Sequence, residues 1–184
     1  DQVRWRTRPE AHLAPYLIDT GTINALRAHL VGAEGAVVYE CVWLQSEYIH
    51  SFARRKNPSA GNRGDPDFGG FYVSGGIFLT GEKRPWKASS AVFGRVRPKK
   101  NFSIEKIKEG YIGAWELVAR YSYLDLNDSG IKGGILGDVS VGVNWYLNPN
   151  LRFMVDYVWA DKKGLGAANS GHADMVLIRG QVIF

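Results

Sequence analysis

Hydrophobic and polar residues alternate with a period of two along most of the chain, and helical periodicity is nearly absent. The clearest segments are 114–123, 138–147 and 151–159. In the first, the side chains at every second position from Trp115 to Tyr123 are apolar, and most of those between are polar. Because successive side chains of a strand point to opposite faces, each segment is predicted to be a strand with one apolar and one polar face.

Turn-forming residues divide these strands. The sequence Asn148-Pro149-Asn150 predicts a tight turn, and residues 32–35, Gly-Ala-Glu-Gly, are predicted to separate two strands. Residues 82–110 do not read as a strand, although 103–110 can form one helical turn. The expected strands are about eight, all antiparallel, and lie near 2–8, 22–31, 36–50, 68–81, 114–123, 138–147, 151–159 and the C-terminal end. No linker interrupts them, so 1–184 is predicted to be a single domain.

Large amphipathic rings lie near the ends of the predicted strands. They are Trp115, Tyr121, Tyr123, Trp145, Tyr157 and Trp159. Such rings suit a membrane interface, and the strands are long enough to cross a bilayer when tilted. The last segment alternates in the same way and ends in Phe184, as expected of a strand recognised by the barrel-assembly machinery. The fold class is therefore predicted to be an all-β, antiparallel transmembrane β-barrel, and a soluble antiparallel sheet is the alternative.

Composition excludes several other classes. Hydrophobic residues make up 45% of the chain, which excludes disorder, and no apolar stretch is long enough for a membrane helix. The single Cys41 excludes a disulfide framework and a cysteine metal cluster. Neither a nucleophile elbow nor a zinc-protease motif is present, so we expect no enzyme, no cofactor and no metal. Aromatic and basic residues fall on opposite faces, which argues against nucleic acid as a partner.

The basic residues divide by type. The formal net charge is +5; the seven bases on the predicted strands are all arginines, and the ten lysines all lie in connections or at strand ends. Arg4, Arg6 and Arg8 recur in steps of two, so their guanidinium groups are predicted to line one face of one strand. Neighbouring like charges repel, and an anion would relieve the repulsion through paired hydrogen bonds. A solvated edge strand is the alternative for this row.

Acidic residues on the polar faces offer other partners for the arginines. They are Glu47, Glu116, Asp138, Asp156 and Asp174. Pairing of Arg152 with Glu116 or Asp156 is a purely structural alternative to a role in binding anions.

Five stretches of sequence resemble one known family over nearly the whole chain. They are RWRTRPEAHLAP with LIDTGTI (4–23), FYVSGGIFLTGEKRPWK (71–87), VFGRVRPKKNF (92–102), GAWELVARYSYLDLND (113–128) and VSVGVNWYLNPNLRFMVDYVWAD (139–161). In these stretches the chain resembles the phosphate-selective porins O and P of Gram-negative outer membranes. The resemblance implies a barrel of about sixteen strands, usually a homotrimer in outer-membrane lipid, that passes phosphate, polyphosphate or other small anions. Eight strands are half of such a barrel, so the chain resembles its C-terminal portion.

The resemblance also implies roles for basic residues. Arg4, Arg6 and Arg8 would belong to a ladder of arginines along the pore, which Arg27 would continue on the next strand. Segment 82–110 would fold into the lumen on the periplasmic side, so that its bases form a vestibule: Arg95, Arg97, Lys99 and Lys100. A second group would collect anions at the extracellular side: Arg54, Arg55 and Lys56. The expected function is passive anion diffusion; the alternative is a structural or adhesive outer-membrane barrel without an ion pathway.

Overall fold

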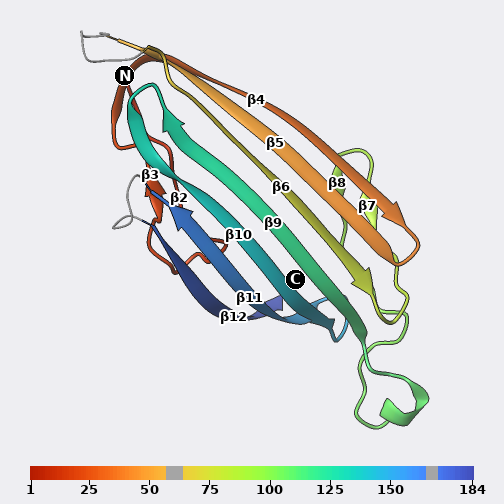
Figure 1. Cartoon of the computed structure of the whole chain (residues 1–184). Coiled ribbons are helices and arrows are strands. Elements are labelled where there is room, and N and C mark those ends of the chain that lie inside the picture. The colour runs from red at the N-terminus through yellow and green to blue at the C-terminus, as the bar shows by residue number, and fades with distance from the viewer. Residues whose placement is uncertain (57–63, 165–169) are drawn as a thin grey trace.

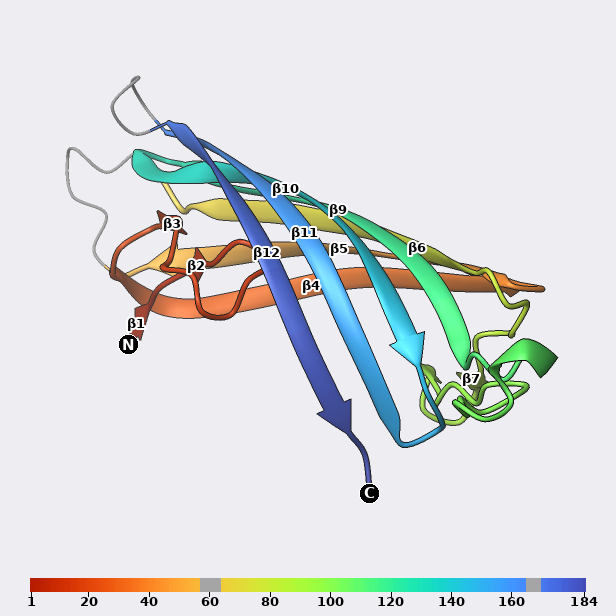
Figure 2. The same cartoon turned by 90° about the horizontal axis from the view of Figure 1, so that it is seen from below.

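The computed structural model describes residues 1–56, 64–164 and 170–184. Eight antiparallel strands form one sheet in the order β1-β4-β5-β6-β9-β10-β11-β12. Their bounds are β1 (Gln2–Val3), β4 (Ile23–Tyr39), β5 (Val42–Arg55), β6 (Asp67–Phe78), β9 (Ala114–Asp128), β10 (Ile131–Tyr146), β11 (Leu151–Lys163) and β12 (Gly171–Val182). The sheet curls into half of a barrel (Figures 1 and 2), which confirms the all-β, antiparallel fold class.

Two small two-stranded sheets accompany the large one. One pairs β2 (Arg6–Thr7) with β3 (Ile18–Asp19), and the other pairs β7 (Trp86–Lys87) with β8 (Val92–Phe93). Figure 2 shows the first near one end of the curled sheet and the second near the other end. The expected helical turn is present as a 3-10 helix, η1 (Ile107–Glu109). Among the described residues, no helix has the length and apolar character needed to cross a membrane.

The two ends of the sheet differ. At the turn end, β4 turns directly into β5, the sequence 148–150 joins β10 to β11, and the C-terminus follows β12. The Asn148 side chain accepts hydrogen bonds from the backbone N–H groups of Asn150 and Leu151 at 2.8 and 2.9 Å, so the predicted tight turn is confirmed. The N-terminus, the last residues of β5 and β11 and the β9–β10 turn lie at the opposite end, the loop end.

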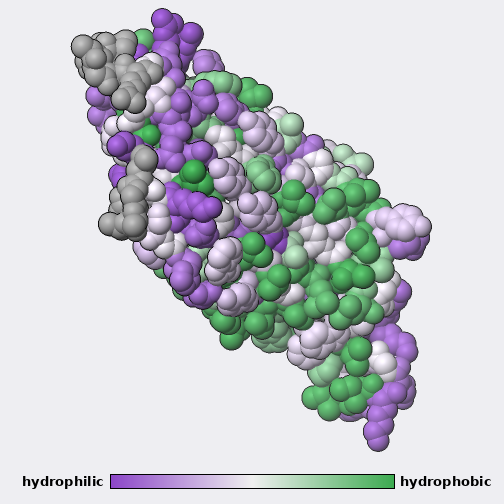
Figure 3. Space-filling view, viewed as in Figure 1, coloured by the Kyte–Doolittle hydropathy of each residue, from purple (hydrophilic) through white to green (hydrophobic). Residues whose placement is uncertain are grey.

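The predicted alternation is confirmed in the long strands. In β9, Leu117 and Tyr121 are 42% and 43% exposed on the convex face, whereas Glu116 on the concave face is fully buried. The convex face carries exposed valine, leucine, isoleucine and aromatic side chains, and a hydrophobic band runs across it in Figure 3. Since water would disfavour such a continuous apolar surface, its pattern is that of a wall facing lipid.

The predicted break at residues 32–35 is wrong. Strand β4 runs through both glycines, with Gly32 opposite Ile49 and Gly35 opposite Ser46. The turn lies instead at Glu40 and Cys41, where Glu40 takes a left-handed conformation with φ 48°. Glycine weakens a strand without ending it when the partner strand continues, so the glycine signal is misleading at this point.

The predicted wall strand 2–8 is also wrong beyond Val3. The chain leaves the large sheet after β1, and residues 4–22 lie against its concave face. A buried apolar cluster joins this inner segment to the wall, with Ile18 and Ile23 packed against Phe68, Leu126 and Leu136. A second cluster, around Trp43, Phe78, Val96 and Tyr146, anchors segment 82–99 at the turn end. The concave face is therefore partly filled from both ends.

Candidate functional site

The three arginines of the predicted row project on one side of the inner segment. Arg4, Arg6 and Arg8 are exposed, whereas Val3, Trp5 and Thr7, which alternate with them, are half-buried, and Val3 and Trp5 pack against the buried cluster on the wall. The ring of Trp5 lies 5.2 Å from that of Phe68 on β6. The predicted alternation thus holds for 3–8, although the apolar side of this segment packs on the protein's own wall.

Each arginine of the row is held differently. Arg4 forms an ion pair with Asp19, and its Nε donates a hydrogen bond to Asp19 Oδ1 at 2.8 Å. The guanidinium carbons of Arg6 and Arg8 lie 4.0 and 4.1 Å from the centre of the Tyr16 ring. Arg8 Nε also donates to the carbonyl oxygen of Ala14 at 2.8 Å. Stacking on a ring leaves most guanidinium N–H groups available to an anion.

The ion pair at Arg4 changes the local electrostatics. Hydrogen bonding from the Arg4 guanidinium holds the pKa of the Asp19 carboxyl below its ordinary value, and Asp19 raises the pKa of Arg4. Both groups are therefore charged at neutral pH, and the charge of Arg4 is largely compensated. Within the described residues Arg6 and Arg8 form no ion pair, so they carry most of the uncompensated charge of the row.

Arg120 on β9 joins the inner segment to the wall. Its Nε donates to Glu10 Oε1 at 2.9 Å, and the same carboxylate oxygen accepts a hydrogen bond from Ser122 at 3.0 Å. The Arg120 guanidinium lies 3.7 Å from the ring centre of Tyr72. A cavity of about 340 Å³ lies between this wall and residues 5–10. Cationic and acidic side chains both reach this part of the hollow.

Arg27 does not share the face of the row. Strand β4 has an irregularity between Ala25 and Arg27, so that its pairing skips Leu26. Because side chains alternate, one extra residue reverses the faces of those beyond it. Arg27 is paired with Arg54 and lies on the convex face, between the concave-facing Ala25 and Ala28. The expectation that Arg27 continues the ladder fails for this reason.

The predicted loop bases are also arranged differently. Arg54 and Arg55 are the last residues of β5 and not part of a loop. Arg55 is buried, and its Nη2 donates to the carbonyl oxygen of Ser129 at 3.0 Å, which ties β5 to the β9–β10 turn. Lys56 follows the strand and is exposed. The structure therefore does not place the three together as an extracellular capture group.

The four bases predicted for the vestibule do not lie together. Arg95 lines a cavity of about 280 Å³ at the turn end together with Arg84, Arg152 and the 148–150 turn. Lys100 instead donates to the carbonyl oxygen of Glu109 at 2.7 Å, next to η1. Lys99 and Arg97 are exposed. Arg95 alone among the four adjoins the cavity.

Glu116 is the centre of a buried polar network at the turn end. It accepts hydrogen bonds from Trp43 Nε1 at 2.7 Å, Asn144 Nδ2 at 2.8 Å and the Tyr146 hydroxyl at 2.7 Å. Arg84 forms an ion pair with it at 2.9 Å. These contacts satisfy a carboxylate that is fully buried, as burial of a charge requires.

The structural alternative for Arg152 and the predicted polar-face position of Asp174 are both wrong. Arg152 bonds Gln181 Oε1 at 3.0 and 2.7 Å instead of pairing with Glu116 or Asp156. Asp174 faces the convex side, where the Tyr157 hydroxyl donates to it at 2.5 Å. Asp174 thus shares the convex face with Val176 and Ile178, as alternation within this strand requires, and does not face the hollow.

Several contacts of the site are absent from the sequence prediction. Tyr16, Asp19 and Glu10 lie in a segment with no clear alternation, so no pattern pointed to them. Arg120 lies on the polar face of the strand predicted at 114–123, and its position on the concave face agrees with that alternation; its contact with Glu10 was not predicted. No group of three or more potential metal ligands was found among the described residues.

Comparison with known proteins supplies the family. A family model described as phosphate-selective porin O and P matches residues 1–184. The chain belongs to this family. It is 31% identical over 179 residues to an uncharacterised protein of Caulobacter vibrioides, covering 93% of this chain and 32% of that protein. It is also 31% identical over 138 residues to Porin O of Pseudomonas aeruginosa, covering 70% of this chain and 29% of Porin O.

The chain spans about a third of the length of these curated relatives. Family membership agrees with the curled, apolar-faced sheet and with an outer-membrane porin of a Gram-negative bacterium. It favours a channel over an enzyme.

Proposed function

We propose that the chain forms part of an outer-membrane channel for passive diffusion of phosphate, polyphosphate or other small anions, with Arg6 and Arg8 as its main anion contacts. The observation that carries this proposal is the row of guanidinium groups on the open side of an inner segment laid against the concave wall. A plain structural strand would gain nothing from neighbouring like charges, whereas an anion among them is stabilised.

The three arginines of the row have different roles in this proposal. Arg4 is compensated by Asp19, so it positions the segment and contributes less to attraction of an anion. Arg6 and Arg8 share the ring of Tyr16, which spaces them without neutralising them. Such an arrangement attracts anions while avoiding the tight enclosure that would slow their release, as conduction requires.

Further parts of the pathway lie at the turn end. We place the periplasm on that side, with Arg95 beside the exit and Arg97, Lys99 and Lys100 farther from it. Phe184, which is fully exposed, serves recognition by the barrel-assembly machinery. The apolar convex face contacts membrane lipid, and the assembled protein is a homotrimer, as the family resemblance implies.

The proposal is tested by the zero-current potential of the protein purified from its own membrane, in a planar bilayer under a KCl gradient. The double variant Arg6→Gln, Arg8→Gln removes two charges from the row. We expect the anion-to-cation permeability ratio to fall about threefold or more. The matched variant Lys106→Gln, Lys108→Gln removes the same charge near η1, outside the row, and is expected to leave the ratio close to wild type.

Phosphate distinguishes a selective channel from a general one. Block of the chloride current by added phosphate, weakened in the Arg6 and Arg8 variant, supports phosphate as a substrate. An unchanged permeability ratio in that variant would refute the assignment of the row. A folded protein that forms no channel would favour a structural barrel.

A further inference from the structure

Two arginines face each other on the convex side of the sheet at its loop end. Arg27 on β4 and Arg54 on β5 are directly paired across the two strands, and both are exposed. The pairs on either side, Ala25 with Arg55 and Ala28 with Ala53, turn their side chains to the concave side, and three of these four side chains are buried. The two guanidinium groups therefore share the outer surface of the wall, away from the hollow.

The described carboxylates nearest along β5 and β6 have other partners. Asp65 accepts a hydrogen bond from the Arg55 backbone N–H at 2.8 Å. Asp67 lies 3.1 Å from His50 Nε2. Residues 57–63, which follow β5 in the chain, contain no aspartate or glutamate. Like charges directly opposite each other destabilise a sheet unless a counter-charge approaches, so this pair favours an external anion.

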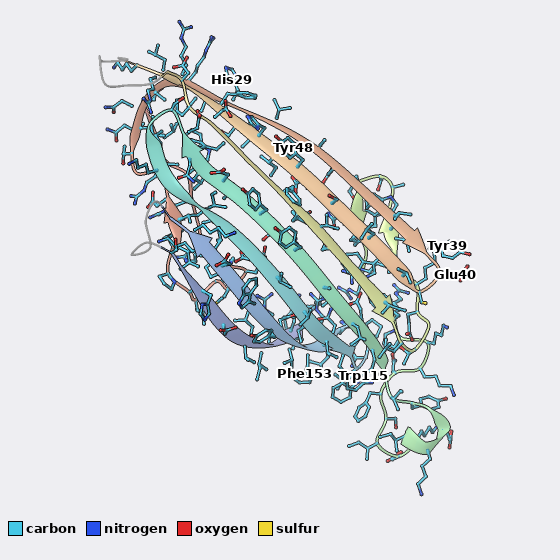
Figure 4. All side chains as sticks on the ribbon, in the orientation of Figure 1. His29, Tyr39, Glu40, Tyr48, Trp115 and Phe153 are labelled. Carbon is cyan, nitrogen blue, oxygen red and sulfur yellow. The ribbon has the colours of Figure 1, made fainter. Side chains whose placement is uncertain are left out.

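Between Arg27 and Arg54 and the turn end, the convex surface of β4 and β5 is mainly apolar. Phe52 lies beside Arg54 on the same face and is 46% exposed, and Val31, Tyr48 and Leu44 continue the exposed apolar surface across β4 and β5. His29 is opposite Phe52 at the upper edge of this surface (Figure 4). In Figure 3 the hydrophilic end of the convex face lies beyond the hydrophobic band, over the loop end. A pair of arginines next to exposed apolar side chains would suit an amphiphilic ligand, which has a charged head and an apolar tail.

Other strands present the opposite charge near the same end. Asp125 on β9, Asp161 on β11 and Asp174 on β12 all follow the outward phase of their strands. Lys132 on β10 and Lys163 on β11 share this outward phase, so what is particular to β4 and β5 is two arginines in direct cross-strand register. A general interfacial band of charge needs only single bases spread around the wall, whereas two guanidinium groups opposite each other can contact one anion together.

We propose that Arg27 and Arg54 bind the phosphate of a lipid headgroup whose acyl chains lie along the exposed apolar residues of β4 and β5. Two guanidinium groups supply several N–H donors to phosphate oxygens, in the bidentate geometry that arginine provides. A lipid is favoured over free phosphate because the acyl chains cover Phe52 and its apolar neighbours at the same time. This site is separate from the row on the concave face.

Native mass spectrometry of the detergent-solubilised protein purified from its own membrane tests the proposal, with added lipid A that carries two phosphates. The double variant Arg27→Gln, Arg54→Gln is expected to reduce the bound fraction, with a loss of affinity of about tenfold or more, since hydrogen bonds to a charged group are strong. The variant Lys106→Gln, Lys108→Gln again serves as the charge-matched control and is expected to bind as wild type.

Two further ligands identify the source of the anion. Chemically dephosphorylated lipid A is expected to bind wild type and the double variant equally weakly. Inorganic phosphate at millimolar concentration is expected to displace little bound lipid A; full displacement would overturn the lipid assignment in favour of free phosphate. Equal lipid A affinity of wild type and variant would refute the site.

The remaining alternative is a second copy of the chain, whose Asp161 or Asp174 would pair with the arginines. The same spectra report the oligomeric state. Loss of the oligomer in the Arg27 and Arg54 variant, with lipid A binding retained, would overturn the proposal in favour of contact between copies. Loss of lipid A with the oligomer and the anion selectivity of the channel unchanged supports it, independently of the proposed pore.

Discussion

Two segments enter the concave side of the same sheet, and Arg6 and Arg8 of the first have the opposite environment to Arg84 of the second. In the inner segment 4–22, Arg6 and Arg8 stack on one exposed ring and keep their outer N–H groups open to solvent. In segment 82–99, the side chain of Arg84 is only 17% exposed and pairs with the fully buried Glu116. The residue type is the same, and the partners decide whether the charge is available to a passing anion.

The difference follows from what lies beneath each segment. The inner segment covers an apolar cluster that includes Phe68 and Leu126, and among the described residues its ion pairs are those of Arg4 with Asp19 and of Glu10 with Arg120. Segment 82–99 lies over Glu116, which requires a positive charge because it is buried. Arg6 and Arg8 therefore present their charge to solvent, whereas Arg84 uses its charge to hold segment 82–99 against the wall.

The largest effect is expected at Glu116. Replacing it with alanine removes the common acceptor of Trp43, Asn144 and Tyr146 and leaves Arg84 without its ion pair. Breaking a buried pair in this way costs about 3–5 kcal/mol. The change should appear as a lower denaturant midpoint for the protein folded in detergent. Glu34→Ala, at an exposed position of β4, is the matched control, and equal midpoints for both variants would contradict the structural role of Glu116.

Trp5→Ala tests whether the wall contact holds the row in place. Loss of the half-buried ring that packs on Phe68 should cost about 2 kcal/mol, less than a fully buried ring would. It should also lower the anion-to-cation permeability ratio, although every arginine remains. Trp5→Phe keeps the ring contact and should restore most of the ratio. A ratio unchanged by Trp5→Ala would show that the row acts without this support.

Asp19→Asn should move selectivity in the other direction. It removes the charge that compensates Arg4, so the permeability ratio for anions should rise by a factor of about two or less, given solvent screening. The pKa of Asp19 is lowered in the folded protein, so its ion pair is intact above the ordinary carboxyl pKa and is lost as pH falls through the lowered value. The wild type and the variant should therefore converge in strong acid. A difference that persists there would exclude Asp19 protonation as the cause.

The smallest effect is expected at Arg95→Gln. This arginine is exposed at the open turn end, where solvent and salt screen its charge. The anion-to-cation permeability ratio should fall less in this variant than in the Arg6 and Arg8 variant. The difference from wild type should disappear at high salt. A larger fall than in that variant would move the main anion site from the row to the turn end.

The long strands could be predicted from sequence because each has one face toward lipid and one toward the hollow, which keeps the period of two intact from Trp115 to Trp159. The row itself was predicted for the same reason, since Trp5 needs a packed side and Arg6 an open one. The strand boundary at Glu40 could not be predicted, because two glycines in β4 resemble a turn and the pairing with β5 overrides them.

The partners of the row could not be predicted for a different reason. Asp19 is 15 residues from Arg4 in sequence, and Glu10 is 110 residues from Arg120. These contacts arise when an irregular segment packs on a wall that is defined by other strands. A pattern confined to neighbouring positions carries no information about them.

The irregularity at Leu26 also has a genetic consequence. The residues on either side, Ala25 and Arg27, already pair with the adjacent Arg55 and Arg54 of β5. Deleting Leu26 would therefore leave each remaining side chain of β4 on its present face. A single deletion near Ala33 would instead exchange the concave-facing and convex-facing side chains of one part of the strand. The length of this strand can therefore change by one residue at Leu26 without exchanging its concave-facing and convex-facing positions.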